Sequence, residues 1–64
     1  MSVGEKLKEA RKTNGLTQRE LGEKVGVSAA VVGQHETGAR NPKIETIKRY
    51  AQAMNMPLSS FLEV

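Results

Sequence analysis

Apolar positions recur at helical spacing along most of the chain, and short breaks containing glycine, asparagine or proline separate the apolar segments. This pattern predicts helices and no strands. A chain of 64 residues is long enough for one small core, so we expect a single all-α domain over residues 1–64. The expected helices, five in all, are residues 2–14, 18–25, 29–37, 42–54 and 58–62.

The stretch 17–38 contains two short helices joined by a tight turn, according to its capping residues. Thr17 can cap the first of them, with Glu20 three residues later in the reciprocal capping position. Gly26 suits the left-handed position that ends a helix, because glycine has no Cβ to clash there. Ser28 can then cap a new helix at once. The rest of the chain is expected to support this second helix.

The helix at 29–37 has two different faces. Val32, His35 and Glu36 repeat at positions i, i+3 and i+4, and we expect this face to point inward. The opposite face is small or uncharged, which allows close approach to a flat polar surface. Its members are Ala29, Ala30, Gly33, Gln34 and Thr37.

Two opposite charges are expected on inward faces. Arg11 lies on the apolar stripe of the first helix, and Glu36 lies on the inward face of 29–37. An unpaired buried charge is costly, so these positions predict an Arg11–Glu36 ion pair. The alternative is that Arg11 extends to water and Glu36 lies at an exposed helix end.

The C-terminal helices supply the rest of the expected core. Pro42 suits the first turn of the fourth helix, and Asn55 is a plausible left-handed residue after it. The residues expected to point inward from these two helices are Ile44, Ile47, Tyr50, Ala51, Met54, Leu58, Phe61 and Leu62.

The chain resembles the DNA-binding domain of the lambda/Cro repressor family over nearly its whole length. The resemblance includes Arg11 in the first helix, Gln18 opening the second, the Gly26 turn and the Glu36-Thr37-Gly38 end of the third. It continues through the proline-led fourth helix. It implies a five-helix fold with a helix-turn-helix, whose second helix lies in the major groove of a palindromic operator. The implied function is sequence-specific double-stranded DNA binding by a transcriptional regulator, with a repressor expected.

The resemblance also suggests which residues contact DNA. Gln34 can bind adenine through two hydrogen bonds, and Ala29 and Ala30 either touch thymine methyl groups or contact nothing. Gln18 is at a helix start, where a phosphate is attracted, and is also a candidate for base contact. The expected phosphate-contacting residues are Thr17, Gln18, Ser28, Thr37, Arg40 and Lys43.

Two positions on the third helix keep alternative interpretations. Gly33 either permits close approach to a sugar-phosphate strand or is simply a tolerated glycine. The related family usually has an aromatic residue or leucine where this chain has His35. A partly buried core histidine is expected there, and a pH-sensing role is an alternative.

Composition narrows the function further. Ten basic and seven acidic residues give a net charge of +3, with the basic excess in 1–14 and 39–50. Basic flanks around a neutral centre suit a DNA reader, although ordinary solvated helices explain them as well. One histidine and no cysteine leave no metal site, cofactor site or catalytic set, so we expect no enzyme. The lack of cysteine and of a long apolar run favours a cytoplasmic protein outside membranes.

The end of the chain is apolar, and family members dimerise through this region. We therefore expect a weak symmetric homodimer through Met56, Pro57 and Leu58. The alternative is that these residues complete the monomer core of a domain excised from a longer protein. A protein-interaction module, such as an antitoxin or an adaptor, is the main competing function because a fold does not fix a function.

Overall fold

The computed structural model describes residues 2–62, and every regular element in this range is a helix. The elements follow in the order α1 (Val3–Thr13), α2 (Gln18–Val25), α3 (Ala29–Thr37), α4 (Ile44–Ala53) and η1 (Leu58–Ser60). The expected all-α class is correct, but the expectation of five helices is not. Residues 2–62 contain four α-helices, and the last element, η1, is a single 3-10 turn. Residues 1, 63 and 64 of the expected domain lie outside the described range.

The helix ends in the first half of the chain follow the capping pattern. Thr17 Oγ1 accepts a hydrogen bond from the Glu20 backbone N–H at 3.0 Å, and the Glu20 carboxylate accepts from the Thr17 N–H in return. Gly26 ends α2 with a φ of +84°, and Ser28 caps α3. The predicted ranges of α2 and α3 are therefore confirmed, together with the tight turn between them.

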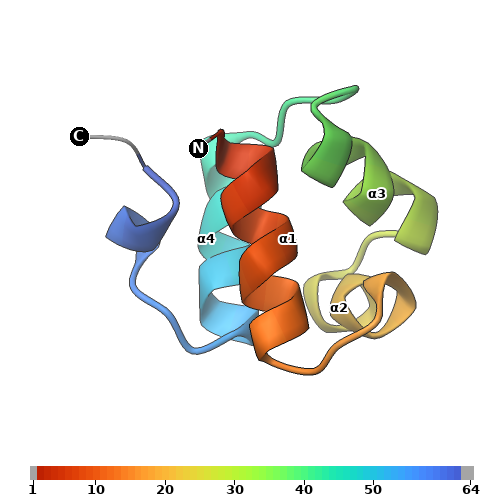
Figure 1. Ribbon diagram of the computed structural model, residues 1–64, viewed down its shortest axis with the longest axis horizontal. Helices are drawn as coiled ribbons and strands as arrows, with labels where there is room; N and C mark the ends of the chain where they lie inside the picture. Colours follow the sequence, from red (N-terminus) through yellow and green to blue (C-terminus); the bar gives the residue numbers. More distant parts are fainter. Residues whose placement is uncertain (1, 63–64) are drawn as a thin grey trace.

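The helices enclose one core. Helix α2 packs against α3 and α4, α3 packs also against α1, and η1 packs against α4. Figure 1 shows α3 on one side of the molecule and η1 on the other, with α1 and α4 between them. The outer face of α3 is thus directed away from the C-terminal segment. The buried apolar residues are Leu7, Ala10, Leu21, Val25, Val32, Ile47, Tyr50, Ala51, Met54 and Phe61.

Helix α4 begins two residues later than expected. Lys43 is its N-cap, so Pro42 lies in the preceding loop rather than in the first turn. Ile44 consequently lies at the open first turn and is 48% exposed, which corrects its expected inward position. The residues of the later turns, from Ile47 onward, form the buried face. The expected left-handed residue Asn55 is confirmed by its φ of 55°.

The last element also differs from expectation. In a 3-10 turn the side chains at i and i+3 lie on the same side, so Leu58 and Phe61 share one face. Phe61 is 1% exposed and fills the core, whereas Leu62 is 36% exposed. The expected inward position of Leu62 is therefore wrong, because the turn ends too early to bring it back to the core.

Two glycines let helices approach backbone closely. A Cβ added at Gly22 would lie 2.4 Å from the Val27 carbonyl oxygen, and one at Gly4 would lie 2.5 Å from the His35 carbonyl oxygen. Gly22 therefore closes the α2–α3 turn, and Gly4 lets α1 pack on the end of α3. At Gly33 the nearest atoms to an added Cβ belong to the Gln18 side-chain amide, at 3.4 Å or more, which is ordinary contact.

We predict opposite effects for the same substitution at these sites. Gly22→Ala should lower the free energy of unfolding by about 1–3 kcal/mol, because backbone must move to admit the methyl group. The matched variant Gly33→Ala should raise it by up to about 1 kcal/mol, since alanine favours a helix interior where there is room. Urea denaturation measures both. Equal effects of the two substitutions would contradict this packing.

Candidate nucleic-acid interface

Helix α3 separates its two faces as its pattern predicts. Val32, His35 and Glu36 are all 6% exposed or less. On the other side Ala30, Gln34 and Thr37 are exposed, and Ala29 and Gly33 are half-buried. The outer face carries no charged side chain. The polar residues that hold the helix in its orientation are on the buried face, namely His35 and Glu36.

The Glu36 carboxylate is the centre of a buried polar network. Arg11 Nε donates to Glu36 Oε2 at 2.6 Å, and Arg11 Nη2 donates to Glu36 Oε1 at 3.2 Å. The two side chains are 11% and 2% exposed. Arg11 Nη1 also donates to the Leu16 carbonyl oxygen at 2.9 Å. The pair expected from the sequence is thus present in the structure, and it joins α1 to α3 and to the loop before α2.

Gln18 completes this network from α2. Its Nε2 donates to Glu36 Oε1 at 3.1 Å, and its amide lies beside Gly33. Gln18 is expected at the DNA surface from its place in the sequence, and its bond to Glu36 is an addition to that expectation. A buried carboxylate can accept more hydrogen bonds than one arginine donates, so the sequence already indicated that Glu36 needs a further donor. One carboxylate therefore ties α3 to both preceding helices.

His35 is a buried core histidine with a polar partner. Its Nδ1 lies 2.7 Å from the Tyr50 hydroxyl, and the two rings meet edge to face at 5.7 Å. Burial lowers the pKa of His35 below its usual value, and the positive charge of Arg40 acts in the same direction. Burial raises the pKa of Tyr50 to about 12, with a smaller contribution from the Glu36 charge. Both rings are therefore neutral near pH 7.

The lowered His35 pKa has a consequence for the fold. A histidine with a lower pKa in the folded state stabilises the protein above its unfolded-state pKa of ~6.5, and this stabilisation is lost as the pH falls towards the folded-state pKa. Helical spacing predicts that His35 and Tyr50 both point inward, but it does not pair them. A buried ring nitrogen needs a partner, and Tyr50 was a polar group on the facing helix.

The end of α3 fixes the start of the loop that leads to α4, called here the basic loop because it contains Arg40 and Lys43. The backbone N–H groups of Gly38 and Arg40 both donate to the Gln34 carbonyl oxygen, at 3.1 and 3.2 Å. The Thr37 hydroxyl donates to the same oxygen at 3.3 Å. The loop is therefore fixed directly beside the outer face of α3. The structure brings Gln34, Thr37 and Arg40 together in this way.

Hydroxyl-bearing residues cap both helices of the helix-turn-helix. Ser28 Oγ accepts from the Val31 N–H at 3.2 Å, and Thr17 Oγ1 accepts from the Glu20 N–H. The Thr17 side chain is also hydrogen-bonded to the Glu20 carboxylate, whereas the Ser28 hydroxyl hydrogen is not needed for capping and can donate to a phosphate oxygen. Thr17 and Gln18 lie at the start of α2 and Ser28 at the start of α3, the ends at which backbone N–H groups favour an anion.

The residues expected at a dimer interface lie elsewhere. Met56 and Leu58 are half-buried and Pro57 is exposed, where the chain enters η1. In Figure 1 this segment is on the side of the molecule away from α3. The structure thus separates the expected DNA face from the expected dimer face.

Other kinds of site find little support in residues 2–62. Within that range no three His, Cys, Asp or Glu side chains are grouped as metal ligands would be. The described helices also include none with the length and apolar character that crossing a membrane requires.

These features define a helix-turn-helix protein, since a tight glycine turn joins two short helices and the second presents an exposed face. The family model described as Helix-turn-helix (HTH_3) matches residues 7–61, and the chain belongs to this family.

Similar proteins agree with that assignment. The chain is 39% identical over 62 residues to the HTH-type transcriptional repressor RghR of Bacillus subtilis, covering 95% of this chain and 46% of the relative. The restriction-modification controller protein C.AhdI from Aeromonas hydrophila has a TM-score of 0.90 at 30% identity, covering 94% of this chain and 87% of that one. The P22 c2 repressor, solved in complex with a synthetic operator, also has a TM-score of 0.90, at 27% identity and with coverage of 98% and 96%. The chain spans less than half the length of the curated relatives it matches.

We predict that Arg11→Met lowers the free energy of unfolding by about 3–5 kcal/mol, because it leaves the Glu36 charge buried without its main partner. A loss of that size is a large part of the stability of a small domain. Thermal denaturation followed by circular dichroism measures the effect. Arg19 is the matched control, because its 3.8 Å pair with Glu23 is largely exposed and Arg19→Met should leave the melting temperature nearly unchanged. Similar melting temperatures for the two variants would contradict a structural role for the Arg11 pair.

Proposed function

We propose that this protein is a transcriptional regulator, most simply a repressor, that binds double-stranded DNA in a sequence-specific manner with α3 in the major groove. The observation that carries this proposal is the exposed, uncharged outer face of α3, held in place by the buried Glu36 network and bordered by Arg40 and Lys43. The similarity to a repressor solved with its operator supports it. This function implies a cytoplasmic location.

Base recognition is assigned to few residues. Gln34 is exposed, and it is the one long hydrogen-bonding side chain on the outer face of α3. Its amide can donate to N7 and accept from N6 in the arrangement that favours adenine, a contact worth about 1–3 kcal/mol of discrimination. Ala29 and Ala30 are next to the helix start and can meet thymine methyl groups. Gln18 reaches the same surface beside Gly33, with its Oε1 available to accept.

Contacts with the phosphates of the DNA backbone are assigned to the borders of the outer face of α3. Thr17, Gln18 and Ser28 occupy helix starts, where N–H groups and the helix dipole favour a phosphate. Thr37, Arg40 and Lys43 occupy the other border, at the end of α3 and in the loop that follows. Such contacts fix the position of the protein on the duplex, whereas Gln34 reads the sequence.

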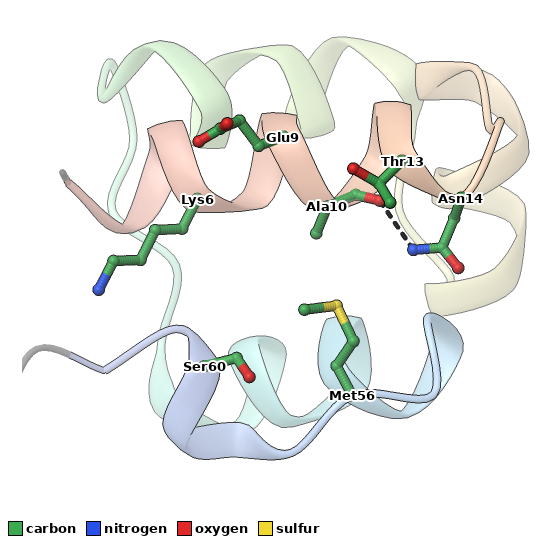
Figure 2. Close-up of a pocket in the computed structure, with 7 residues that line it drawn as sticks. All are labelled: Lys6, Glu9, Ala10, Thr13, Asn14, Met56 and Ser60. Atoms are coloured by element: carbon green, nitrogen blue, oxygen red, sulfur yellow. Dashed lines mark hydrogen bonds between the residues drawn. The ribbon is translucent and has the colours of Figure 1, made fainter.

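A weak homodimer would place two copies of α3 on a palindromic operator, about one helical turn apart. The proposed contact is at Met56, Pro57 and Leu58. The Met56 side chain projects into a hollow between α1 and the C-terminal segment. Figure 2 shows this side chain pointing toward Ala10 of α1. This apolar edge supports a self-association surface distinct from the DNA face.

A protein-interaction module such as an antitoxin or an adaptor is the second candidate. The observation that favours it is the lack of charge on the outer face of α3, which suits a protein surface as well as a groove. Binding to duplex DNA that weakens as salt rises favours the regulator, and no binding even at low salt favours the interaction module.

We predict different losses for Gln34→Ala and Arg40→Ala on duplexes selected from a random pool. Gln34→Ala should relax preference at one or two base pairs of each half-site, because it removes a base contact. Arg40→Ala should weaken binding to every sequence alike and reduce the salt slope by about one, because it removes a phosphate contact. Fluorescence anisotropy at several salt concentrations measures both. Identical behaviour of the two variants across sequences would contradict the division into base and phosphate contacts.

A further inference from the structure

A hollow of about 410 Å³ lies between α3 and the loop that leads to α4. Its volume is many times the ~30 Å³ share of one water molecule, so it can admit a phosphate group. The two long basic side chains at its rim give it a positive character. It is lined by Val27, Val31, His35, Arg40, Asn41, Lys43 and Thr46.

One nitrogen of the His35 ring is held inside the protein, and the other is not. Nδ1 is hydrogen-bonded to the Tyr50 hydroxyl. Among residues 2–62, no buried side-chain nitrogen or oxygen lacks a hydrogen-bond partner, and the His35 bond involves Nδ1 alone. Nε2 therefore keeps some contact with solvent, and His35, although only 5% exposed, is among the residues lining the hollow.

The Tyr50 bond also determines which nitrogen carries hydrogen. Tyr50 is 1% exposed, and its hydroxyl is hydrogen-bonded to His35 alone among the described residues. If His35 Nδ1 donated, the Tyr50 O–H would be a buried donor without an acceptor, which costs about 1–3 kcal/mol. Tyr50 is therefore the donor, and the neutral His35 ring carries its hydrogen on Nε2. A hydrogen-bond donor thus faces outward, fixed in orientation by the core.

We propose that this hollow holds one backbone phosphate of bound DNA, with His35 Nε2–H at its floor and Arg40 and Lys43 at its rim. The inference rests on the proposed function and goes beyond it, because it makes His35 a phosphate-contacting residue. It also connects DNA to the core through a continuous path from the phosphate, through the His35 ring, to Tyr50 on α4.

The charges around His35 determine the sign of the effect of pH. Burial and the positive charge of Arg40 oppose protonation of the ring, and Tyr50 occupies Nδ1 as a donor. On the remaining side Glu36 is neutralised by Arg11. A phosphate in the hollow neutralises the loop charges and accepts from Nε2–H, so it raises the His35 pKa in the complex. Affinity for DNA is then greater below the His35 pKa of the free protein, and this gain is lost as the pH rises above the pKa of the complex.

The test is NMR titration of the His35 ring in the free protein and in the protein bound to a selected duplex. We expect the duplex to raise the His35 pKa by about one unit or more, which corresponds to about tenfold tighter binding at the acidic end. Duplexes carrying a neutral methylphosphonate at one backbone position at a time locate the contact. One position in each half-site should abolish the rise. An equal rise with every modified duplex would show only the general field of DNA and would overturn the inference.

Variants and a second anion complete the test. Lys43→Gln should reduce the rise in the His35 pKa, whereas Lys8→Gln, which removes an exposed charge from α1, should not. Inorganic phosphate that raises the His35 pKa while the duplex does not would identify a free-anion site and overturn the assignment to DNA. The backbone amide of Gln34 reports duplex binding independently. If Gln34 shifts and the His35 pKa does not change, this inference alone fails, and if neither responds, the proposed function fails with it.

Discussion

The carboxylate of Glu36 is the group on which the arrangement of the helix-turn-helix depends. It lies inside the protein and accepts hydrogen bonds from Arg11 of α1 and Gln18 of α2, while its own backbone belongs to α3. A buried charge tolerates little displacement, because losing a partner exposes the full desolvation cost. The three helices are therefore held in one relative orientation by a polar contact rather than by apolar packing alone.

The inner face of α3 determines what its outer face can do. Glu36 fixes one side of the helix and the His35–Tyr50 hydrogen bond fixes another, against α4. With the inner face held at these points, the outer face can remain small and uncharged without loss of order. The Gln34 carbonyl oxygen extends this order into the basic loop by accepting from the Arg40 N–H. The positions proposed to read bases and to bind phosphates thus share one support.

Local sequence determined most of the fold. The Thr17–Glu20 capping box, the left-handed Gly26 and the Ser28 cap define α2 and α3, because these effects act within a few residues. The Arg11–Glu36 pair also followed from the pattern, since two charges on inward faces need each other. The C-terminal half was less predictable. Whether α4 begins at Pro42 or Ile44, and whether the last turn is α or 3-10, depends on packing that the local pattern does not contain.

The sequence predicted which residues of α3 point inward and outward, but it predicted fewer of the hydrogen bonds and close contacts between segments. Helical spacing showed that Gln34 points outward and His35 inward. Spacing could not show that Gln18 bends inward to Glu36, or that Gly4 and Gly22 meet backbone carbonyls, because those contacts join distant segments. Even there the chemistry gave a partial signal: a buried carboxylate and a buried imidazole each need more partners than their neighbours in sequence supply.

The proposed function requires that the outer face of α3 enter the DNA groove. Because the chain has no cysteine, a single cysteine can be placed at will, and the most direct measurement is cleavage of bound duplex DNA by an iron chelate attached to that cysteine. We predict strong cleavage within the bound site from Ala30→Cys and weak cleavage from Ser59→Cys, because Ser59 belongs to η1, which lies on the far side of the molecule from α3 in Figure 1. Stronger cleavage from position 59 than from position 30 would contradict it.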